Sequence, residues 1–528
     1  MQGCRVTGLQ GIEQATKPAA FGRTVVWALA CAALLTLACS GGNKRKATAT
    51  TRASGSPFAG PSSPAVRAPG SPPPLPVVTG PPAPVVRGPV LTPPPIPAIG
   101  GATPPSGLQA APLPFPAVGE TTPAPVRGPS STPAPNVDNG PLTIGLLVPL
   151  SGADAAAGKD LSQGFQLYLS QHNGRLGGFA ITLAGEDTAS NPATAQAKLR
   201  TLAEQDKAAA IVGVASDTVA AAVRGYVDMH QLPTVIAGAG LDDLTQRDKS
   251  NWLFRVAATN SQTTQPLGAY ACTQLGFKRV ALIAQDDSVG TEAAGGFAHS
   301  FTDCGGTISQ EDYVPAGTGD WAPAVHMLNQ SGVDAVFAAV EGDDAPRFLK
   351  AYRDAGVALP LLGLGALVDE PLLAQEGATS AGVVSAAAFS AALADPATQA
   401  FVKAYADSYG GAPAGIAAAD GYLAAEVLDV ALLTAGTQAT VNPAALRDAL
   451  RGVKLASTAS GGAFAFDDDQ QGVFDIYVRQ TQQLPDGRPG NLVRTADTLP
   501  AVSQFWTYPP DAFLAGKRYQ ALKGTWAR

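Results

Sequence analysis

The chain has 528 residues and a formal net charge of −7, from 35 basic and 42 acidic side chains. This mildly acidic balance, without a basic stripe interleaved with aromatic residues, argues against nucleic-acid binding. The four histidines are scattered without the spacing of metal ligands, so we expect no metal and no cofactor.

The N-terminal segment has the order of an export signal. An apolar run from Val25 to Ala38 follows three separated basic side chains and is too short to span a bilayer. Cys39 ends the stretch LTLAC, which resembles a bacterial lipoprotein box, although Thr36 stands where the box prefers leucine. We therefore expect a signal peptide over residues 1–39, a lipid on Cys39, and an extracytoplasmic protein anchored to the cell membrane. The alternatives are an ordinary signal peptide cut near Ala38 and an uncleaved anchor.

A proline-rich segment follows the signal. Of the 45 prolines, 26 lie within residues 51–140, and aromatic residues are nearly absent there. Such a segment buries too little apolar surface to offset the entropy of ordering it. We predict that residues 40–140 are a disordered linker.

From residue 141 onward the composition is that of a globular protein, and about 390 residues remain, enough for two lobes. Continuous apolar runs predict buried strands at 142–148, 180–184, 209–212, 234–236, 279–284, 335–339, 361–364 and 382–386. Helical spacing predicts helices at 159–172, 192–205, 218–230, 262–275, 291–301, 344–355, 398–409 and 416–433. The alternation predicts an α/β fold of parallel βαβ units, with ligands bound at the C-terminal ends of the strands.

Several motifs of this region form a recognisable series. In chain order they read IGLLVPLSG (144–152), EDT (186–188), IVGVAS (211–216), FR (254–255) and GAFAFDD (462–468). In order and spacing, over about residues 142–480, they resemble the type I periplasmic binding proteins. The nearest branch is that of the leucine, isoleucine and valine binding proteins, which serve ABC transporters as substrate-binding lipoproteins.

The resemblance implies a binding domain over residues 141–508, made of two lobes joined by three crossovers. Lobe one would hold about 142–257 and 389–470, and lobe two about 258–388 and 471–508. Residues 509–528 would form a C-terminal tail outside the family pattern, with aromatic residues that pack on a lobe.

Cys272 and Cys304 are the cysteines of the predicted globular part. One ends the helix before a predicted strand and the other ends the helix after it, so both should lie at the same edge of the sheet. A disulfide closing this loop could add roughly 3 to 4 kcal/mol. The alternative is two separate buried thiols.

The resemblance also implies where a ligand carboxylate is held. In the family it meets backbone amides and a hydroxyl at the start of the third helix, here Ser216, and the loop after the fourth strand, here Ala239 and Gly240. A helix N-terminus suits an anion because its free N–H groups point at it. Ser216 could instead be a helix cap without a ligand. Ser151, after the first strand, is a further expected contact.

The acidic partners of a ligand ammonium are missing from the pattern. The family positions carry Asn260 and Gly365 here, and Val289 stands where the family often has tyrosine. Glu341, after a predicted strand, either replaces the lost carboxylate or is solvated at the start of the next helix. We therefore predict that free leucine, isoleucine and valine bind weakly, and that a carboxylate or amide lacking the ammonium binds better.

No nucleophile elbow, P-loop or dinucleotide fingerprint is present in the sequence, so we expect no enzyme. The predicted function is that of a monomeric, membrane-anchored solute-binding lipoprotein that delivers a small polar molecule to an ABC permease. The alternatives are a tethered interaction module that regulates cell-wall synthesis and a ligand sensor for a separate receptor.

Overall fold

The computed structural model describes residues 138–528, apart from residue 329 and the side chains of residues 494–496. The predicted signal peptide, the lipid site at Cys39 and almost all of the predicted linker lie outside the described residues. All described residues belong to the unit formed by residues 101–528.

One lobe, here called lobe one, is built on a six-stranded sheet with the order β2-β3-β1-β4-β5-β6. Its neighbours are parallel except for β2 and β3. The strands are β1 Pro141–Val148, β2 Arg175–Leu176, β3 Phe179–Asp187, β4 Ala210–Gly213, β5 Thr234–Ile236 and β6 Leu253–Arg255. The helical segments between them are α1 Ala155–Gln171, α2 Pro192–Arg200, η1 Thr201–Gln205, α3 Asp217–His230 and η2 Asp242–Leu244.

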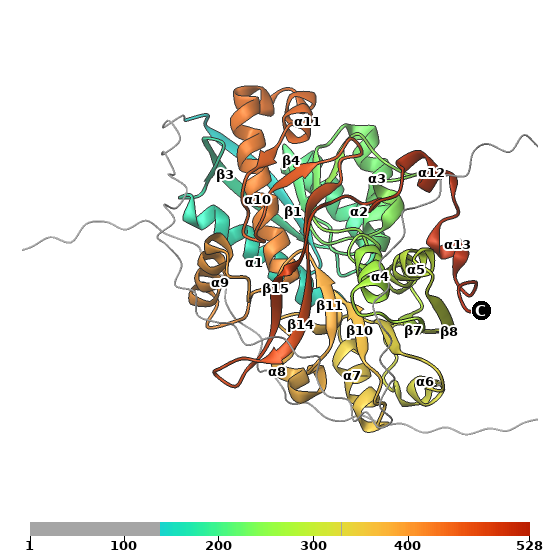
Figure 1. The fold of residues 1–528 in the computed structure, drawn as a ribbon. Coiled ribbons are helices and arrows are strands. Elements are labelled where there is room, and N and C mark those ends of the chain that lie inside the picture. Colours follow the sequence, from blue (N-terminus) through green and yellow to red (C-terminus); the bar gives the residue numbers. More distant parts are fainter. Residues whose placement is uncertain (1–137, 329) are drawn as a thin grey trace, which may run out of the picture. The chain divides into compact units, whose positions relative to one another are not determined.

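Three later helices return to lobe one, where α10 packs along α1 (Figure 1). They are α9 Pro396–Ser408, α10 Ile416–Ala435 and α11 Pro443–Arg451, with the short η5 Gly436–Thr440 before α11. Asp395 and Asn442 cap α9 and α11 by accepting hydrogen bonds from backbone N–H groups of the first turn. A proline follows each cap, at a position where its missing N–H costs nothing.

Lobe two is built on a second sheet, with the order β12-β13-β14-β11-β10-β9-β7-β8 and with β15 paired to β14. This sheet includes β12 and β13, which lie within the residues 389–470 expected in lobe one. Its parallel strands are β7 Arg279–Gln285, β8 Thr307–Val314, β9 Ala335–Ala339, β10 Leu361–Leu364 and β11 Val384–Ala387. Its antiparallel strands are β12 Lys454–Leu455, β13 Phe464–Phe466, β14 Gly472–Gln483 and β15 Pro489–Val502. Its helical segments are α4 Thr264–Thr273, α5 Ser288–Asp303, α6 Ala322–His326, α7 Asp344–Asp354, η3 Gly365–Val368, α8 Leu373–Glu376 and η4 Gly377–Ser380.

The structure confirms the predicted α/β fold with parallel sheets. The runs predicted at 234–236, 335–339 and 361–364 are strands with those bounds, and every residue in them is buried. An unbroken apolar run fits a strand covered on both faces, which explains why these strands could be located. The pair β14 and β15 was not predicted, and it adds antiparallel strands to lobe two.

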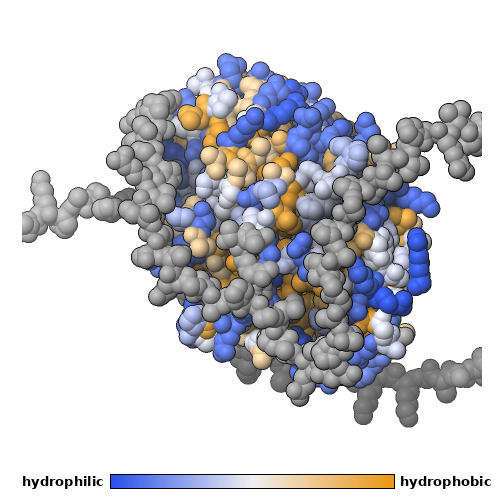
Figure 2. Space-filling model, viewed as in Figure 1, coloured by the Kyte–Doolittle hydropathy of each residue, from blue (hydrophilic) through white to orange (hydrophobic). Residues whose placement is uncertain are grey.

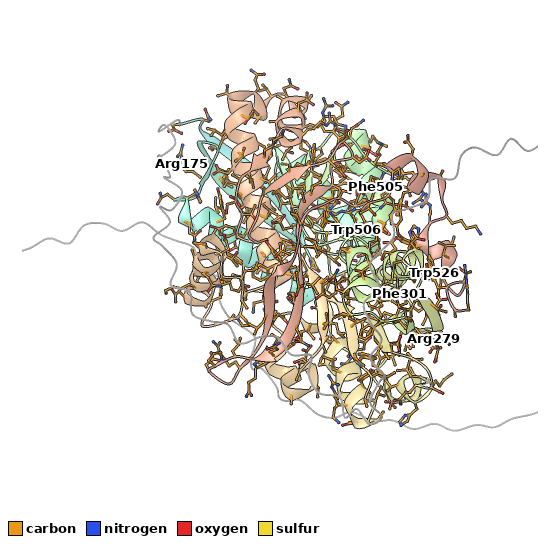
Figure 3. All side chains as sticks on the ribbon, viewed as in Figure 1. Arg175, Arg279, Phe301, Phe505, Trp506 and Trp526 are labelled. Atoms are coloured by element: carbon orange, nitrogen blue, oxygen red, sulfur yellow. A yellow bond between two sulfur atoms is a disulfide. The ribbon has the colours of Figure 1, made fainter. Side chains whose placement is uncertain are left out.

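The last residues form what we call the C-terminal strap, residues 509–528, with α12 Pro510–Ala515 and α13 Tyr519–Leu522. In Figure 1 α13 lies beside α5, and in Figure 3 Trp526 lies on the same side of the molecule as Phe301 of α5. The tail aromatics therefore pack on lobe two, and Tyr519 is 6% exposed. A cavity of about 190 Å³ lies under the strap, between η2 and α5.

Cys272 of α4 and Cys304 at the end of α5 are joined by a disulfide, with their Cα atoms 6.4 Å apart. The bridge ties together two helices that pack against each other in lobe two. Within residues 138–528, no helix has both the length and the apolar character needed to cross a membrane. On the face seen in Figure 2, hydrophobic areas lie between hydrophilic ones.

Candidate functional site

The candidate site begins at the turn that follows β5. We call Gly240, Leu241 and Asp242 the amide turn, because their three consecutive backbone N–H groups all donate to carboxyl groups. Arg255, fully buried at the end of β6, holds the other side of this turn by donating to the carbonyl oxygen of Leu241 at 2.7 Å and, more weakly, to that of Ala239 at 3.4 Å. These bonds hold the turn in place through its carbonyl groups.

Asp217, the first residue of α3, fills most of the amide turn. One of its carboxylate oxygens accepts from the N–H groups of Gly240 at 2.8 Å and Leu241 at 2.9 Å. The other accepts from the Asn260 amide at 2.8 Å and from the Ser288 hydroxyl at 2.7 Å. Asn260 follows the crossover out of lobe one, and Ser288 begins α5 in lobe two. Asp217 therefore ties the two lobes together.

Glu292 of α5 reaches the same turn from lobe two. Its carboxyl oxygen accepts from the N–H of Asp242 and from the side-chain amide of Asn260, both at 2.9 Å. Gln520 of the strap donates to its other oxygen. Burial, and then the neighbouring Asp242 and Asp217, raise the pKa of Glu292 well above its ordinary value. Two carboxyl groups, one from each lobe, thus share the donors at this point of the interface.

Glu341 follows β9 and belongs to the same acidic surroundings. Its backbone N–H donates to Gln285 at 2.9 Å, and no described residue donates a hydrogen bond to its carboxyl group. Burial raises the pKa of Glu341 to about 8, and the negative charges of Asp287, Asp217 and Asp154 act in the same direction. The Glu341 side chain is half-buried, and its role as a replacement carboxylate stays a prediction.

The residues expected to hold a ligand carboxylate have other partners. Ser216 precedes α3, but its hydroxyl pairs with that of Thr218 at 3.1 Å and makes no capping bond. The N–H of Ala239 donates to Val214 within the sheet region. The N–H of Gly240 donates to Asp217, and a Cβ on Gly240 would lie 2.1 Å from the Asn260 oxygen. Glycine is required there because the crossover passes so close.

The remaining predicted contacts lie in different surroundings. Ser151 is exposed and its hydroxyl donates to Asp187 at 2.7 Å within lobe one. Val289 is half-buried in the first turn of α5, next to Ser288. Gly365 is buried at the start of η3, and its carbonyl oxygen accepts from Arg479 at 2.8 Å. Of these residues, Val289 directly follows Ser288, whose hydroxyl donates to Asp217.

Asp217, Glu292 and Ser288 were not among the residues predicted for the site. The signal for Asp217 was an acidic residue in the first turn of a helix, where the helix dipole favours it. The signal for Glu292 was an acidic residue followed by small and apolar residues in the first half of α5. Among the described residues, no group of three His, Cys, Asp or Glu side chains is arranged to hold a metal ion.

Comparison with known proteins identifies the fold and its class. Residues 141–488 match the model of the periplasmic binding protein family. A structure of an ABC transporter substrate-binding protein from Sphaerobacter thermophilus is 34% identical, with a TM-score of 0.66, covering 69% of this chain and 99% of that one.

Two further relatives carry named ligands. A solute-binding protein of an ABC transporter from Rhodopseudomonas palustris BisB5, solved with 3,4-dihydroxy benzoic acid, is 27% identical with a TM-score of 0.65, covering 70% of this chain and 99% of its own. A Leu/Ile/Val-binding protein homolog of Brucella suis is 26% identical over 49% of this chain and 67% of its own length. These relatives are named as binding proteins, and their family implies an extracytoplasmic location. The chain belongs to the periplasmic binding protein family and is a substrate-binding protein of the ABC transporter type.

Proposed function

We propose that this chain is the membrane-anchored, extracytoplasmic solute-binding lipoprotein of an ABC importer. The observation that supports the proposal is that side chains of both lobes meet at one point. Groups of lobe one, the crossover and lobe two converge on Asp217, so a solute bound beside it would contact both lobes. A ligand stabilises a closed state only through contacts that the open state lacks, and this geometry supplies such contacts.

The anchoring part of the proposal rests on the sequence. The short apolar run before Cys39 and the proline-rich residues after it have the order of a signal, a lipid site and a linker. An ABC permease is the proposed partner, because substrate-binding proteins of this type deliver their solutes to one. The molecule is proposed to act as a monomer, and no enzymatic step is required.

The ligand is proposed to be a small polar molecule. The relatives name an aromatic acid in one case and branched-chain amino acids in another, so ligand chemistry varies among them. Asn260 and Gly365 offer no negative charge to an ammonium at the positions the family uses. Glu341 offers a carboxyl group from a different strand, and because a bound cation favours the charged form of that group, it is the residue through which an amine could still be accepted.

The test is a ligand screen followed by an uptake measurement. The purified mature chain should gain thermal stability with at least one member of a panel of small amines, amides, carboxylates and amino acids, because a ligand that binds only the folded state raises the melting temperature. Asn260→Ala should lose that gain. Cells lacking the protein should then take up that compound more slowly. A chain that responds to no solute, in cells whose uptake is unchanged, would contradict the proposal.

A further inference from the structure

Three consecutive N–H groups pointing in one direction form an anion-binding concavity. In the amide turn, all three are already used by carboxyl groups of the chain itself, two by Asp217 and one by Glu292. The turn lies at the C-terminal end of β5, where ligands of open α/β sheets are bound. The anion position of this site is therefore occupied by the protein.

The turn cannot easily release these carboxyl groups by changing shape. The Arg255 guanidinium also donates to Thr245 and to the Gln471 side chain, so it is fixed on several sides. Asn260 also returns a backbone N–H to the carbonyl of Gly240 at 2.7 Å. If Asp217 were absent, the N–H groups of Gly240 and Leu241 would remain in place as buried, unpaired donors, which is costly unless another acceptor replaces it.

The Asp217 carboxylate has no free acceptor position for a ligand. A carboxylate offers about four acceptor positions, and Asp217 accepts four hydrogen bonds while being only 8% exposed. A ligand carboxylate would have to displace it or lie beside it. Displacement loses those bonds, and two neighbouring carboxylates repel each other strongly at a site shielded from water.

We propose that Asp217 determines the ligand class of this protein: by occupying the amide turn it excludes carboxylate ligands, and the site takes a neutral or cationic solute that donates hydrogen bonds. Glu341 is the acceptor for those donors, because no described residue donates to its carboxyl group. The inference rests on the proposed function, and it is an alternative to the prediction that a ligand carboxylate is held by Ser216 and Gly240.

The test uses three probes of one shape, benzylamine, benzamide and benzoate, measured by calorimetry on the mature chain. The wild type should bind benzoate more weakly than the amine or the amide. Asp217→Ser frees two N–H groups and removes the charge, so it should raise benzoate affinity at least about tenfold, equivalent to about 1.4 kcal/mol. Asp206→Ser, which removes an exposed carboxylate from the same lobe, is the matched control and should leave all three affinities unchanged.

Asp217→Asn keeps the size of the side chain and removes only its charge, so it serves if the serine variant does not fold. If the wild type binds benzoate and neither variant binds it more tightly, the inference is overturned. Folded variants that gain no affinity for benzoate would also overturn it. Failure of the proposed function looks different. In that case the wild type binds no solute of the full panel. The benzoate affinity of the Asp217 variants is a separate measurement that does not depend on that result.

Discussion

Glu341 shows what the acidic surroundings of the site do to a single residue. Burial is the largest cause of its raised pKa of about 8, and the charges of Asp287, Asp217 and Asp154 add to it. In the unfolded chain a glutamate titrates near pH 4.3. Between these values the folded protein binds more protons at this position than the unfolded chain does, so the contribution of Glu341 to stability falls as the pH rises.

Glu341→Gln should remove this pH dependence. We expect the variant to gain about 1 to 3 kcal/mol in unfolding free energy relative to the wild type when the pH rises from 5 to 9. The measurement is urea unfolding of both proteins at the two pH values. Asp206→Asn, at an exposed position, is the control and should follow the wild type. Parallel pH curves for the wild type and the glutamine variant would show that Glu341 is not protonated in the folded state.

The predicted ligand contacts include Gly240 of the amide turn, but the carboxyl groups that accept from this turn were not among them. The resemblance directed attention to Ser216 and Gly240, whereas the side chain that accepts from the N–H groups of Gly240 and Leu241 is one residue after Ser216, at Asp217. A sequence does not reveal which of two adjacent side chains at a helix start turns toward a neighbouring loop. Glu292 could not be predicted for a different reason, because its partner, the N–H of Asp242, belongs to the other lobe.

At the scale of elements, prediction succeeded where burial is uniform and failed where it is not. The strand β9 reads AVFAA and is buried throughout. Its sheet neighbour β8 reads TISQEDYV, lies at the end of the strand order, and is mostly half-buried. A strand with one covered edge tolerates polar residues, so no apolar run marks it. The pair β14 and β15 was missed for a similar reason, because polar side chains such as Arg479 and Thr481 are buried in it through hydrogen bonds.

The C-terminal strap contacts both lobes. On lobe one, the Arg247 guanidinium donates to backbone carbonyls of residues 513, 514 and 516, and Arg518 pairs with Asp243 at 2.7 Å. On lobe two, Tyr519 pairs with His299 at 2.9 Å, and the Glu311 carboxylate accepts from the N–H groups of residues 524 and 526. A segment held at both ends across two lobes resists their separation.

Removal of residues 510–528 should therefore let the lobes open more widely. We expect a larger radius of gyration in small-angle X-ray scattering without ligand, and a lower melting temperature because buried Tyr519 is lost. Arg518→Ala cuts only the ion pairs with lobe one and should lie between the wild type and the truncated chain. Identical scattering from all three proteins would show that the strap does not restrain the lobes.

At the scale of the whole molecule, the lobes are joined at several distant points. Arg255 at the end of β6 forms a bridge with Gln471, just before β14. Elsewhere, the Asp369 carboxylate of lobe two accepts from the N–H of Ile416 at 3.1 Å, at the start of α10 in lobe one. Opening of the lobes would therefore have to break the Asp369 contact as well as those made by Asp217 and Glu292, whereas the Arg255 bridge lies beside two of the chain crossovers.

The proposed anchor gives a prediction for the full-length protein in the cell. Cys39→Ala removes the thiol that would carry the lipid, so the protein should move from the membrane fraction to the soluble extracytoplasmic fraction. Cys31→Ala, within the apolar run, is the matched control and should leave the protein with the membrane. Immunoblots of fractionated cells make the comparison, and membrane retention of the Cys39 variant would reject lipidation at that residue.

The bond between Asp217 and the amide turn also has a consequence for competition. An acceptor carried on the chain is present at an effective concentration of at least millimolar order, whatever the solution contains. A free carboxylate at micromolar concentration competes poorly with it for the N–H groups of Gly240 and Leu241. Background organic acids would therefore leave the amide turn unoccupied by foreign ions, and the protein could sample a mixture rich in acids while responding only to other solutes.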